Sequence, residues 1–280
     1  MEHQPFSVAM CVYGKDNPNW FDRAIKSVTT EQTLKPNELV LIVDGPIPEE
    51  IEKIISKHKT ILANINIAFK LERFEVNQGH GNARRKSVEL CSNELIALMD
   101  ADDISLPDRF ESQLNLYDVS KADVVGGNIS EFIGEESNVI SYRIVPEKDA
   151  DIKKVAKSRC PMNQVSVMFK KSSYDVVGGY IDWFWEEDYY LWLRMILQNM
   201  VFANSSSIFV NVRVGEEMYK RRGGLKYYRS EKRLQKFMLG EKMISLPKYV
   251  INCGKRFIVQ VLMPSKIRGW LYKKLARSKR

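Results

Sequence analysis

An uncharged run of five residues, 95–99, ends directly in three aspartates, Asp100, Asp102 and Asp103. A continuous apolar run of this length is typical of a strand buried on both faces, as in a parallel sheet. In open α/β sheets, ligands bind beyond the carboxyl ends of such strands. Because like charges repel, three carboxylates at one turn favour a bound cation, and divalent ions prefer oxygen ligands. We therefore expect a metal site here, with a polar turn before the next helix as the alternative.

The first 120 residues alternate between segments typical of strands and segments typical of helices. Strands are expected at 7–12, 38–43, 67–74 and 95–99, and amphipathic helices at 19–31, 48–58, 81–91 and 106–117. This order predicts an α/β fold with a mostly parallel central sheet, right-handed crossovers and flanking helices.

Beyond residue 120 the alternation loosens. Strands are expected at 123–127, 165–169 and 208–212, and a helix at 186–198. From Gly224 onward the sequence is helical in pattern and basic, and Pro247 and Pro264 divide it. We predict one α/β domain over residues 1–215 and a basic helical C-terminal region over 216–280.

Charge is distributed unevenly along the chain. The whole chain carries a net charge of +8, whereas residues 211–280 alone hold 20 Lys and Arg against 4 Asp and Glu, so the rest is net acidic. Such asymmetry predicts an anionic partner, which could be nucleic acid, an anionic membrane or a phosphorylated substrate.

Cysteine and histidine positions argue against other kinds of site. The four cysteines are scattered and the three histidines form no sequence cluster, so neither a disulfide framework nor a zinc site is expected. The N-terminus has no signal-peptide pattern and no apolar run approaches the roughly 18 residues of a membrane span. We expect a cytoplasmic location.

Two further segments have a composition that suits a nucleotide. Asp44 ends the second expected strand and would serve base or ribose hydroxyls, or else is only a turn residue before Gly45. The glycine-bearing stretch 77–85 leads into a helix, where backbone N–H groups and arginines can approach phosphate. It matches neither a P-loop nor the Rossmann fingerprint.

Aromatic residues surround three acids in the segment 183–194. Glu186, Glu187 and Asp188 stand at the start of an expected helix, where acids are also favoured by the helix dipole alone. The functional interpretation is a carboxylate in an aromatic-walled cleft, with partial burial raising its pKa toward that of a general base. Aromatic walls also suit the apolar faces of sugar rings.

Taken in order, these segments resemble the family 2 glycosyltransferases, whose nucleotide-sugar-binding fold is called GT-A. The resemblance covers Phe6 to Val214 and is carried by the opening strand 7–13, by Asp44-Gly45, by Asn82-Ala83-Arg84, by Asp100-Ala101-Asp102-Asp103, and by Glu187-Asp188 with Leu191-Trp192-Leu193-Arg194. The chain departs from the family pattern at Cys11 (usually Pro), at the single acid before Gly45, and at Arg85 (usually Asn).

The resemblance implies an inverting, metal-dependent and non-processive transfer of a sugar from a nucleotide diphospho-sugar, with a UDP-sugar expected, to a saccharide. It implies that Asp188 is the catalytic base with Glu187 beside it, and that Asp102 and Asp100 hold Mn²⁺ or Mg²⁺. The implied donor-binding residues are Tyr13, Asp44, Gly45, Arg84, Asp100, Ala101 and Asp102.

The enzymes that the chain resembles assemble surface polysaccharides such as O-antigen and exopolysaccharide, and their acceptors are often sugars on a polyprenyl diphosphate. We expect Arg221 and Arg222 to bind that diphosphate and Trp185 to contact the acceptor, with a solvated basic turn as the alternative for the arginines. Residues 266–275 have the pattern of an interfacial helix on an anionic leaflet, or of a helix packed on the domain. Peripheral association with the inner face of the cell membrane is therefore expected.

Two other functions remain open from the sequence. A nucleotidyltransferase would share the sheet and the acidic metal site. A nucleic-acid-binding protein could use the basic tail, but no nucleic-acid module is recognisable, and the tail's cations alternate with Trp270 and Leu271 in an amphipathic pattern, so no nucleic acid is expected as partner.

Overall fold

The structure, a computed structural model, describes residues 3–181, 183–215 and 223–264. Within them a nine-stranded sheet runs in the order β3-β2-β1-β4-β8-β6-β9-β5, and β7 pairs with β6 outside this path. The strands are β1 (Phe6–Tyr13), β2 (Glu38–Asp44), β3 (Ala68–Arg73), β4 (Leu95–Met99), β5 (Ile104–Ser105), β6 (Val124–Phe132), β7 (Val139–Arg143), β8 (Met168–Lys170) and β9 (Phe202–Arg213).

The first four strands form the parallel half of the sheet. β1 pairs in parallel with β2 and β4, and β2 pairs in parallel with β3. β8 joins the two halves as a short antiparallel strand between β4 and β6, and β9 lies parallel to β6. The mostly parallel sheet that the sequence predicts is therefore confirmed, with β5, β7 and β8 as its antiparallel members.

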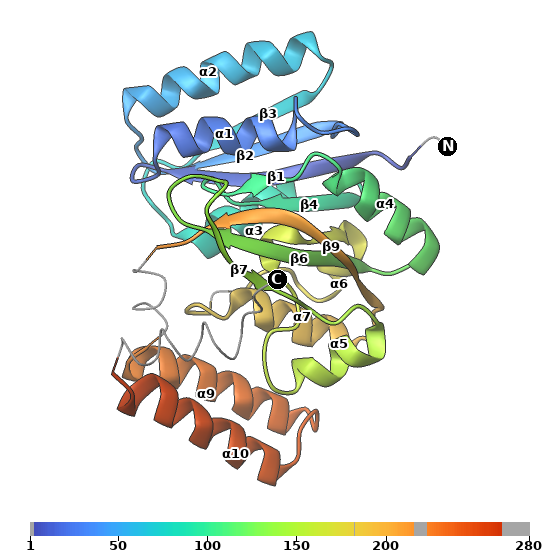
Figure 1. Cartoon of the computed structure of the whole chain (residues 1–280), viewed down its shortest axis with the longest axis vertical. Coiled ribbons are helices and arrows are strands. Elements are labelled where there is room, and N and C mark those ends of the chain that lie inside the picture. The colour runs from blue at the N-terminus through green and yellow to red at the C-terminus, as the bar shows by residue number, and fades with distance from the viewer. Residues whose placement is uncertain (1–2, 182, 216–222, 265–280) are drawn as a thin grey trace.

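Helices cover both faces of the sheet (Figure 1). They are α1 (Pro18–Val28), α2 (Glu49–Asn64), α3 (His80–Leu90), α4 (Arg109–Ser120), α5 (Asp149–Ala156), α6 (Lys171–Val176), α7 (Glu187–Leu197), α9 (Leu225–Gly240) and α10 (Leu246–Phe257), with short turns η1 (Gln164–Ser166) and η2 (Ile258–Leu262). Side chains of β1 alternate between two cores: Val8 and Met10 pack with α1, α2 and α4, whereas Ala9 packs on the side of α3, α6 and α7.

Several elements differ from the sequence-based expectation. The expected strand 208–212 is the second half of the longer β9, and the segment 165–169 is divided between η1 and β8. The elements β5, β7, α5 and α6 were not predicted. Helix α1 begins at Pro18, one residue early, because the Asn17 side chain accepts the backbone N–H groups of Asn19 and Trp20.

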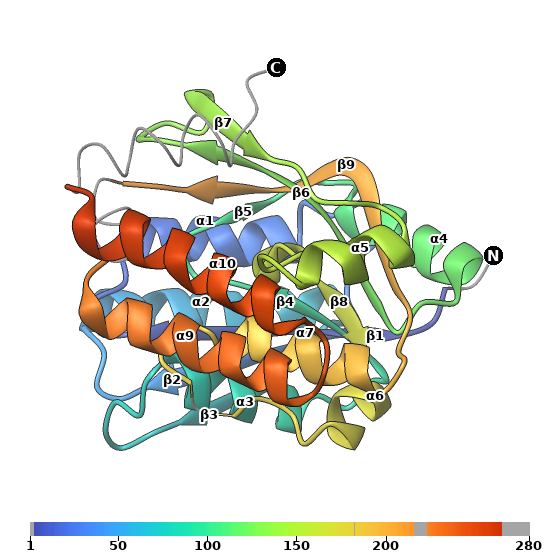
Figure 2. The same cartoon turned by 90° about the horizontal axis from the view of Figure 1, so that it is seen from below.

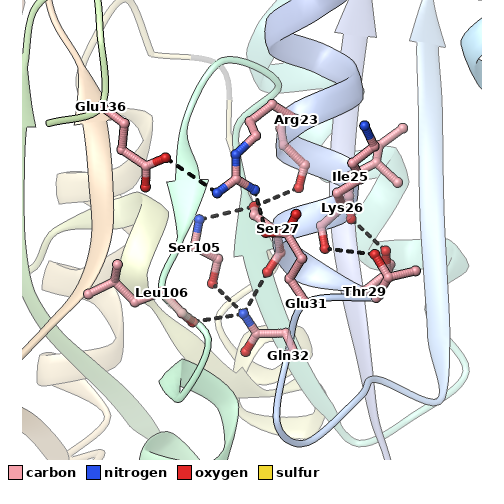
Figure 3. Close-up of polar contacts among 12 residues, drawn as sticks. Arg23, Ile25, Lys26, Ser27, Thr29, Glu31, Gln32, Ser105, Leu106 and Glu136 are labelled. Atoms are coloured by element: carbon pink, nitrogen blue, oxygen red, sulfur yellow. Dashed lines mark hydrogen bonds and ion pairs between the residues drawn. The ribbon is translucent and has the colours of Figure 1, made fainter.

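Polar contacts hold the chain after β4 against helix α1 (Figure 3). The backbone N–H of Ser105 donates to the buried Ser27 hydroxyl at 3.0 Å. The Gln32 side-chain amide donates to the carbonyl oxygen of Leu106 at 2.8 Å and to that of Ser27 at 2.5 Å. Since each buried polar group has a partner, this connection fixes where the acidic turn 100–103 lies.

Helices α9 and α10 lie side by side at the end of the molecule opposite α2 (Figures 1 and 2). A separate apolar core joins this hairpin to the domain, and it contains Ala156, Trp183, Tyr189, Leu193, Leu234, Met238 and Ile244. The described part of the C-terminal region is therefore packed onto α7. Within residues 3–181, 183–215 and 223–264, no helix has both the length and the apolar character that a bilayer span needs.

Candidate active site

Arg84 of α3 lies between acids from two other elements. Its Nη2 donates to Oδ1 of Asp100, after β4, at 2.8 Å, and its Nη1 lies 3.8 Å from Oε1 of Glu187, the first residue of α7. Burial disfavours the charge of Arg84, but the carboxylates of Asp100 and Glu187 raise its pKa above the ordinary value. The two acidic motifs of the sequence therefore meet at one place, with a buried guanidinium between them.

The turn after β4 is clamped by the last residue of β9, Arg213. Its backbone N–H donates to Oδ1 of Asp103 at 2.8 Å, and its Nε donates to the carbonyl oxygen of Asp102 at 3.3 Å. The guanidinium carbon lies 4.3 Å from the ring centre of Trp20 and 4.5 Å from that of Phe132. The predicted metal ligand Asp102 is thus held by a residue that the sequence analysis did not single out.

Asp16 is a further acid at this turn, and it too was missed. Its Oδ2 accepts the backbone N–H of Tyr13 at 2.9 Å. Burial, together with the negative charges of Asp102 and Asp100, raises the pKa of Asp16 to about 7. Asp16 follows β1, a neighbour of β4 in the parallel half, so its position beyond a strand end was the available signal.

The acids at this turn fit a hard divalent cation. In the part of the chain that the structure describes, no group of three or more His, Cys, Asp and Glu side chains is arranged to hold a metal. Asp100 and Asp102 nevertheless offer carboxylate oxygens, the ligands that Mg²⁺ and Mn²⁺ prefer, and Mg²⁺ commonly uses one or two protein carboxylates with substrate phosphates. Burial is the main cause of the raised pKa of Asp16, and the charges of Asp102 and Asp100, which a cation would offset, add to it.

Asp44 ties the end of β2 to the loop before α3. Its carboxylate accepts the backbone N–H groups of Gln78 at 2.6 Å and of Gly79 at 3.0 Å, and the residue is buried. Gly45 follows with φ +86°, and a Cβ there would lie 2.6 Å from the nitrogen of Asn77. Only glycine fits this turn without strain. Contact with a base or ribose stays a prediction for Asp44.

The remaining predicted donor-binding residues lie beside this turn. Tyr13, at the end of β1, pairs in register with Asp44 and is exposed. Ala101 is buried in the core between the acids of the turn.

Three acids at the start of α7 differ in their surroundings. Glu186 is buried, and burial and the charge of Asp188 raise its pKa to about 8 against the opposing effect of Arg256. Burial and Asp188 also raise the pKa of Glu187 to about 6, with Arg84 opposing. The Asp188 side chain is half-buried, and its Oδ1 accepts the adjacent backbone N–H at 2.6 Å. The raised pKa favours the neutral form of Glu186 beside Asp188.

The loop before α7 presents two aromatic side chains to solvent. Trp185 has φ +60°, a conformation that is uncommon for a large residue, and its ring centre lies 6.0 Å from that of Phe184. The carbonyl oxygen of Phe184 accepts the Ser230 hydroxyl at 2.6 Å, and Nζ of Lys226 lies 4.1 Å from the Phe184 ring centre. Helix α9 thus fixes the loop that carries the predicted acceptor residue Trp185.

Some predicted residues lie outside the described part of the chain. Arg221 and Arg222, the expected diphosphate ligands, fall there, as does the expected interfacial helix at 266–275.

Comparison with known sequences identifies relatives over nearly the whole chain. The family model described as "Glycosyl transferase family 2" matches residues 7–178. An Escherichia coli protein described as UDP-Gal:alpha-D-GlcNAc-diphosphoundecaprenol beta-1,3-galactosyltransferase is 33% identical over 273 residues, covering 97% of this chain and 96% of its own. The amylovoran biosynthesis glycosyltransferase AmsE of Erwinia amylovora is 31% identical, covering 96% and 98%.

Solved structures share the fold at low sequence identity. S. aureus TarS 1-349 in complex with UDP-GlcNAc has a TM-score of 0.67 at 15% identity, covering 92% of this chain and 73% of TarS 1-349. The mannosyltransferase PcManGT from Pyrobaculum calidifontis, in complex with GDP-Man and Mn²⁺, has a TM-score of 0.65 at 11% identity, covering 99% and 77%. The GT-A architecture expected from the sequence is thereby confirmed.

Proposed function

The chain belongs to glycosyl transferase family 2, and we propose that it transfers a sugar from a UDP-sugar to a saccharide on a polyprenyl diphosphate. The observation that carries this proposal is the position of Arg84 between Asp100 and Glu187. Sugar transfer requires the donor's diphosphate and anomeric carbon to lie near a general base. The contacts of Arg84 bring the acids after β4, proposed to bind the diphosphate, close to the acids that begin α7, which include the proposed base.

Asp188 is the proposed catalytic base. It takes the proton of the acceptor hydroxyl while the hydroxyl oxygen attacks the anomeric carbon. The bond from that carbon to the diphosphate oxygen breaks, and the nucleoside diphosphate leaves with the bonding electrons, so the sugar configuration inverts. The raised pKa of Glu186 supports this assignment, because the neutral form that it favours leaves less negative charge around the helix start.

Positive charge near the leaving diphosphate is the second requirement. Arg84 supplies a permanent cation beside Asp100, and its planar fork suits phosphate oxygens. Asp102 and Asp100 would hold Mn²⁺ or Mg²⁺, which when bound offsets the charge of the diphosphate. Arg213 positions the Asp102 backbone for that role. Tyr13, Asp44, Gly45 and Ala101 would line the nucleoside side.

The relatives' names and the aromatic loop support the proposed acceptor class. The Escherichia coli relative's name specifies a diphosphoundecaprenol-linked GlcNAc, and AmsE is named for amylovoran biosynthesis. Trp185 and Phe184 are exposed in the loop that precedes Asp188 and offer flat apolar surfaces to a sugar ring. We place Arg221 and Arg222 on the acceptor diphosphate. The proposal includes O-antigen or exopolysaccharide synthesis at the inner face of the cell membrane.

A donor panel tests this function. UDP-, GDP- and dTDP-sugars are incubated with Mn²⁺ and a short-chain GlcNAc-diphospho-lipid, and products are identified by mass spectrometry. We expect one UDP-sugar to yield a disaccharide-diphospho-lipid and UDP, with inverted anomeric configuration by NMR. Release of pyrophosphate or of a nucleoside monophosphate would favour a nucleotidyltransferase, and retained configuration would exclude Asp188 as the base of a single displacement.

A further inference from the structure

Helix α10 and the turn η2 expose most of their large apolar side chains and bury the polar side chains of Asn252 and Gln260. Six large apolar residues along α10 and η2 each expose between 37% and 63% of their surface: Leu246, Val250, Ile251, Phe257, Ile258 and Leu262. The buried residues of the same two elements are Asn252, Cys253 and Gln260. This arrangement is the reverse of an ordinary surface helix, whose apolar stripe faces the core.

Specific polar contacts fix this orientation. The Asn252 amide donates to the carbonyl oxygen of Lys157 at 3.0 Å and to Oε1 of Gln235 at 2.8 Å. Arg256 pairs with Glu231 of α9 and donates to the carbonyl oxygen of Ser158 at 2.7 Å. Because buried polar groups lose free energy when their partners are removed, α10 cannot rotate its apolar side inward without breaking these bonds.

The exposed apolar side chains continue to the active-site loop. The backbone N–H of Gly224 donates to the carbonyl oxygen of Gln260 at 2.8 Å, which brings the exposed Leu225 next to η2. Leu225 precedes Lys226, whose ammonium lies over the exposed ring of Phe184. We call Leu225, Leu246, Val250, Ile251, Phe257, Ile258 and Leu262 the outer face. Figures 1 and 2 show α10 as the outermost helix of this end of the molecule.

The outer face belongs to a strongly basic part of the chain. Residues 223–264 contain nine Lys and Arg but only two Glu, and one of these, Glu231, is paired with Arg256. Residues 265–280, which follow η2 directly, contain seven Lys and Arg and no acid. Apolar side chains bordered by cations suit the boundary between the headgroups and acyl chains of an anionic leaflet.

We propose that the outer face is a docking surface for an anionic phospholipid bilayer. This inference deepens the proposed function, because a lipid-linked acceptor would reach Asp188 from the same surface on which the hairpin rests. A second copy of the chain fits less well, since a symmetric contact would place two net-positive hairpins against each other.

Vesicle flotation with the full chain tests the surface. The variant Val250→Ser/Ile251→Asn/Ile258→Asn removes exposed apolar side chains of the outer face. The control Val119→Ser/Val176→Ser removes apolar side chains that are even more exposed, on α4 and α6. We expect the wild type and the control to float with phosphatidylglycerol-containing vesicles. The triple variant should show an at least tenfold lower partition coefficient, and all three should bind pure phosphatidylcholine weakly.

Undiminished flotation of a folded triple variant would overturn the proposal, and circular dichroism establishes the folding. A wild type that elutes as a dimer in gel filtration, with a monomeric triple variant, would assign the face to a second copy instead. The triple variant should still transfer sugar to a short-chain, water-soluble acceptor while losing transfer to an acceptor embedded in vesicles. If no donor is used at all but flotation is lost as expected, the proposed function fails and the docking surface stands.

Discussion

Individual carboxylates at the start of α7 are distinguished by what surrounds them. Asp188 is only half-buried, whereas Glu187 faces Arg84 across 3.8 Å. We therefore expect Asp188→Asn to lower kcat by about 10²–10⁴-fold, the usual contribution of a general base, because the amide cannot accept the acceptor's proton. The Kd for UDP with Mn²⁺, measured by calorimetry, should stay within about twofold of the wild type.

Glu187→Gln is the matched control for that substitution. It keeps the shape of the neighbouring side chain, and we expect a smaller loss of kcat because Glu187 acts on Arg84 rather than on the acceptor. Near-normal turnover by Asp188→Asn, or a larger loss in Glu187→Gln, would move the base assignment from Asp188 to Glu187.

Asp102 and Asp103 are adjacent in the sequence but have different roles, one predicted to bind metal and the other structural. Asp103 is buried and holds the backbone of Arg213, whereas Asp102 belongs to the predicted metal pair. We expect Asp102→Ala to abolish Mn²⁺-dependent binding of UDP in calorimetry and to leave the melting temperature nearly unchanged. Asp118→Ala, on the exposed side of α4, provides the control. UDP affinity that is unaltered in Asp102→Ala would remove this residue from the metal site.

Among the elements, the buried strands β2 and β4 were predicted almost to the residue, whereas β6, which is equally buried, was predicted only over its first part. All seven residues of β2 are buried, and its five apolar residues 39–43 lie between Glu38 and Asp44, a continuous apolar run of the kind that is typical of a parallel strand. β9 was half missed because its first part is polar. The amide of Asn204, for example, is held by the carbonyl oxygen of Pro146 at 2.7 Å. Such long-range partners leave no periodic pattern in a single sequence.

The candidate site likewise contains some residues that the sequence predicted and others that it did not. The acids at strand and helix ends were predictable because a motif places them next to an apolar run. Asp16 also follows a strand, but the effect of Asp102 and Asp100 on its pKa, like the stacking of Arg213 between Trp20 and Phe132, depends on residues far along the chain. Their roles depend on the order in which strands assemble, which spacing alone does not contain.

Helix α7 and the hairpin also share a titratable contact at Glu186. Its neighbours are Glu187 and Asp188 on α7, Tyr227 on α9 and Arg256 on α10. The pKa of Glu186 is raised from 4.5 to about 8, so between these pH values the folded state binds a proton that the unfolded state has lost. The free energy of unfolding therefore falls as the pH rises from about 4.5 to about 8. Glu186→Gln should remove that loss, which is of the order of 3 kcal/mol in unfolding free energy.

Melting temperatures at pH 5 and pH 8 measure this effect. We expect Glu186→Gln and wild type to melt alike at pH 5, and the variant to melt higher at pH 8. Equal behaviour at both pH values would show that Glu186 is ionised in the folded protein. Other acids with raised pKa values, such as Asp16, contribute equally to both proteins and cancel in the difference.

At the scale of the whole molecule, the apolar core between α7 and the α9–α10 hairpin determines whether the C-terminal region stabilises the α/β domain or is independent of it. Leu234 and Met238 of α9 are fully buried against the segment that contains Trp183, Tyr189 and Leu193. Each such side chain contributes about 1.5–3 kcal/mol when it is buried, so these contacts stabilise the loop that precedes Asp188 as well as the hairpin.

A chain ended after residue 222 should therefore melt at a lower temperature than the full protein and bind a hydrophobic dye such as ANS, because Trp183 and Leu193 become exposed. Leu234→Ala should reproduce part of this effect in the full chain, with a loss of about 2–5 kcal/mol in chemical denaturation. The outer-face variant Val250→Ser/Ile251→Asn/Ile258→Asn alters the same hairpin on its solvent side and should melt like the wild type. An unchanged melting temperature in the truncated chain would instead make residues 1–215 an independent domain, because the core beside α7 would then contribute nothing to its stability.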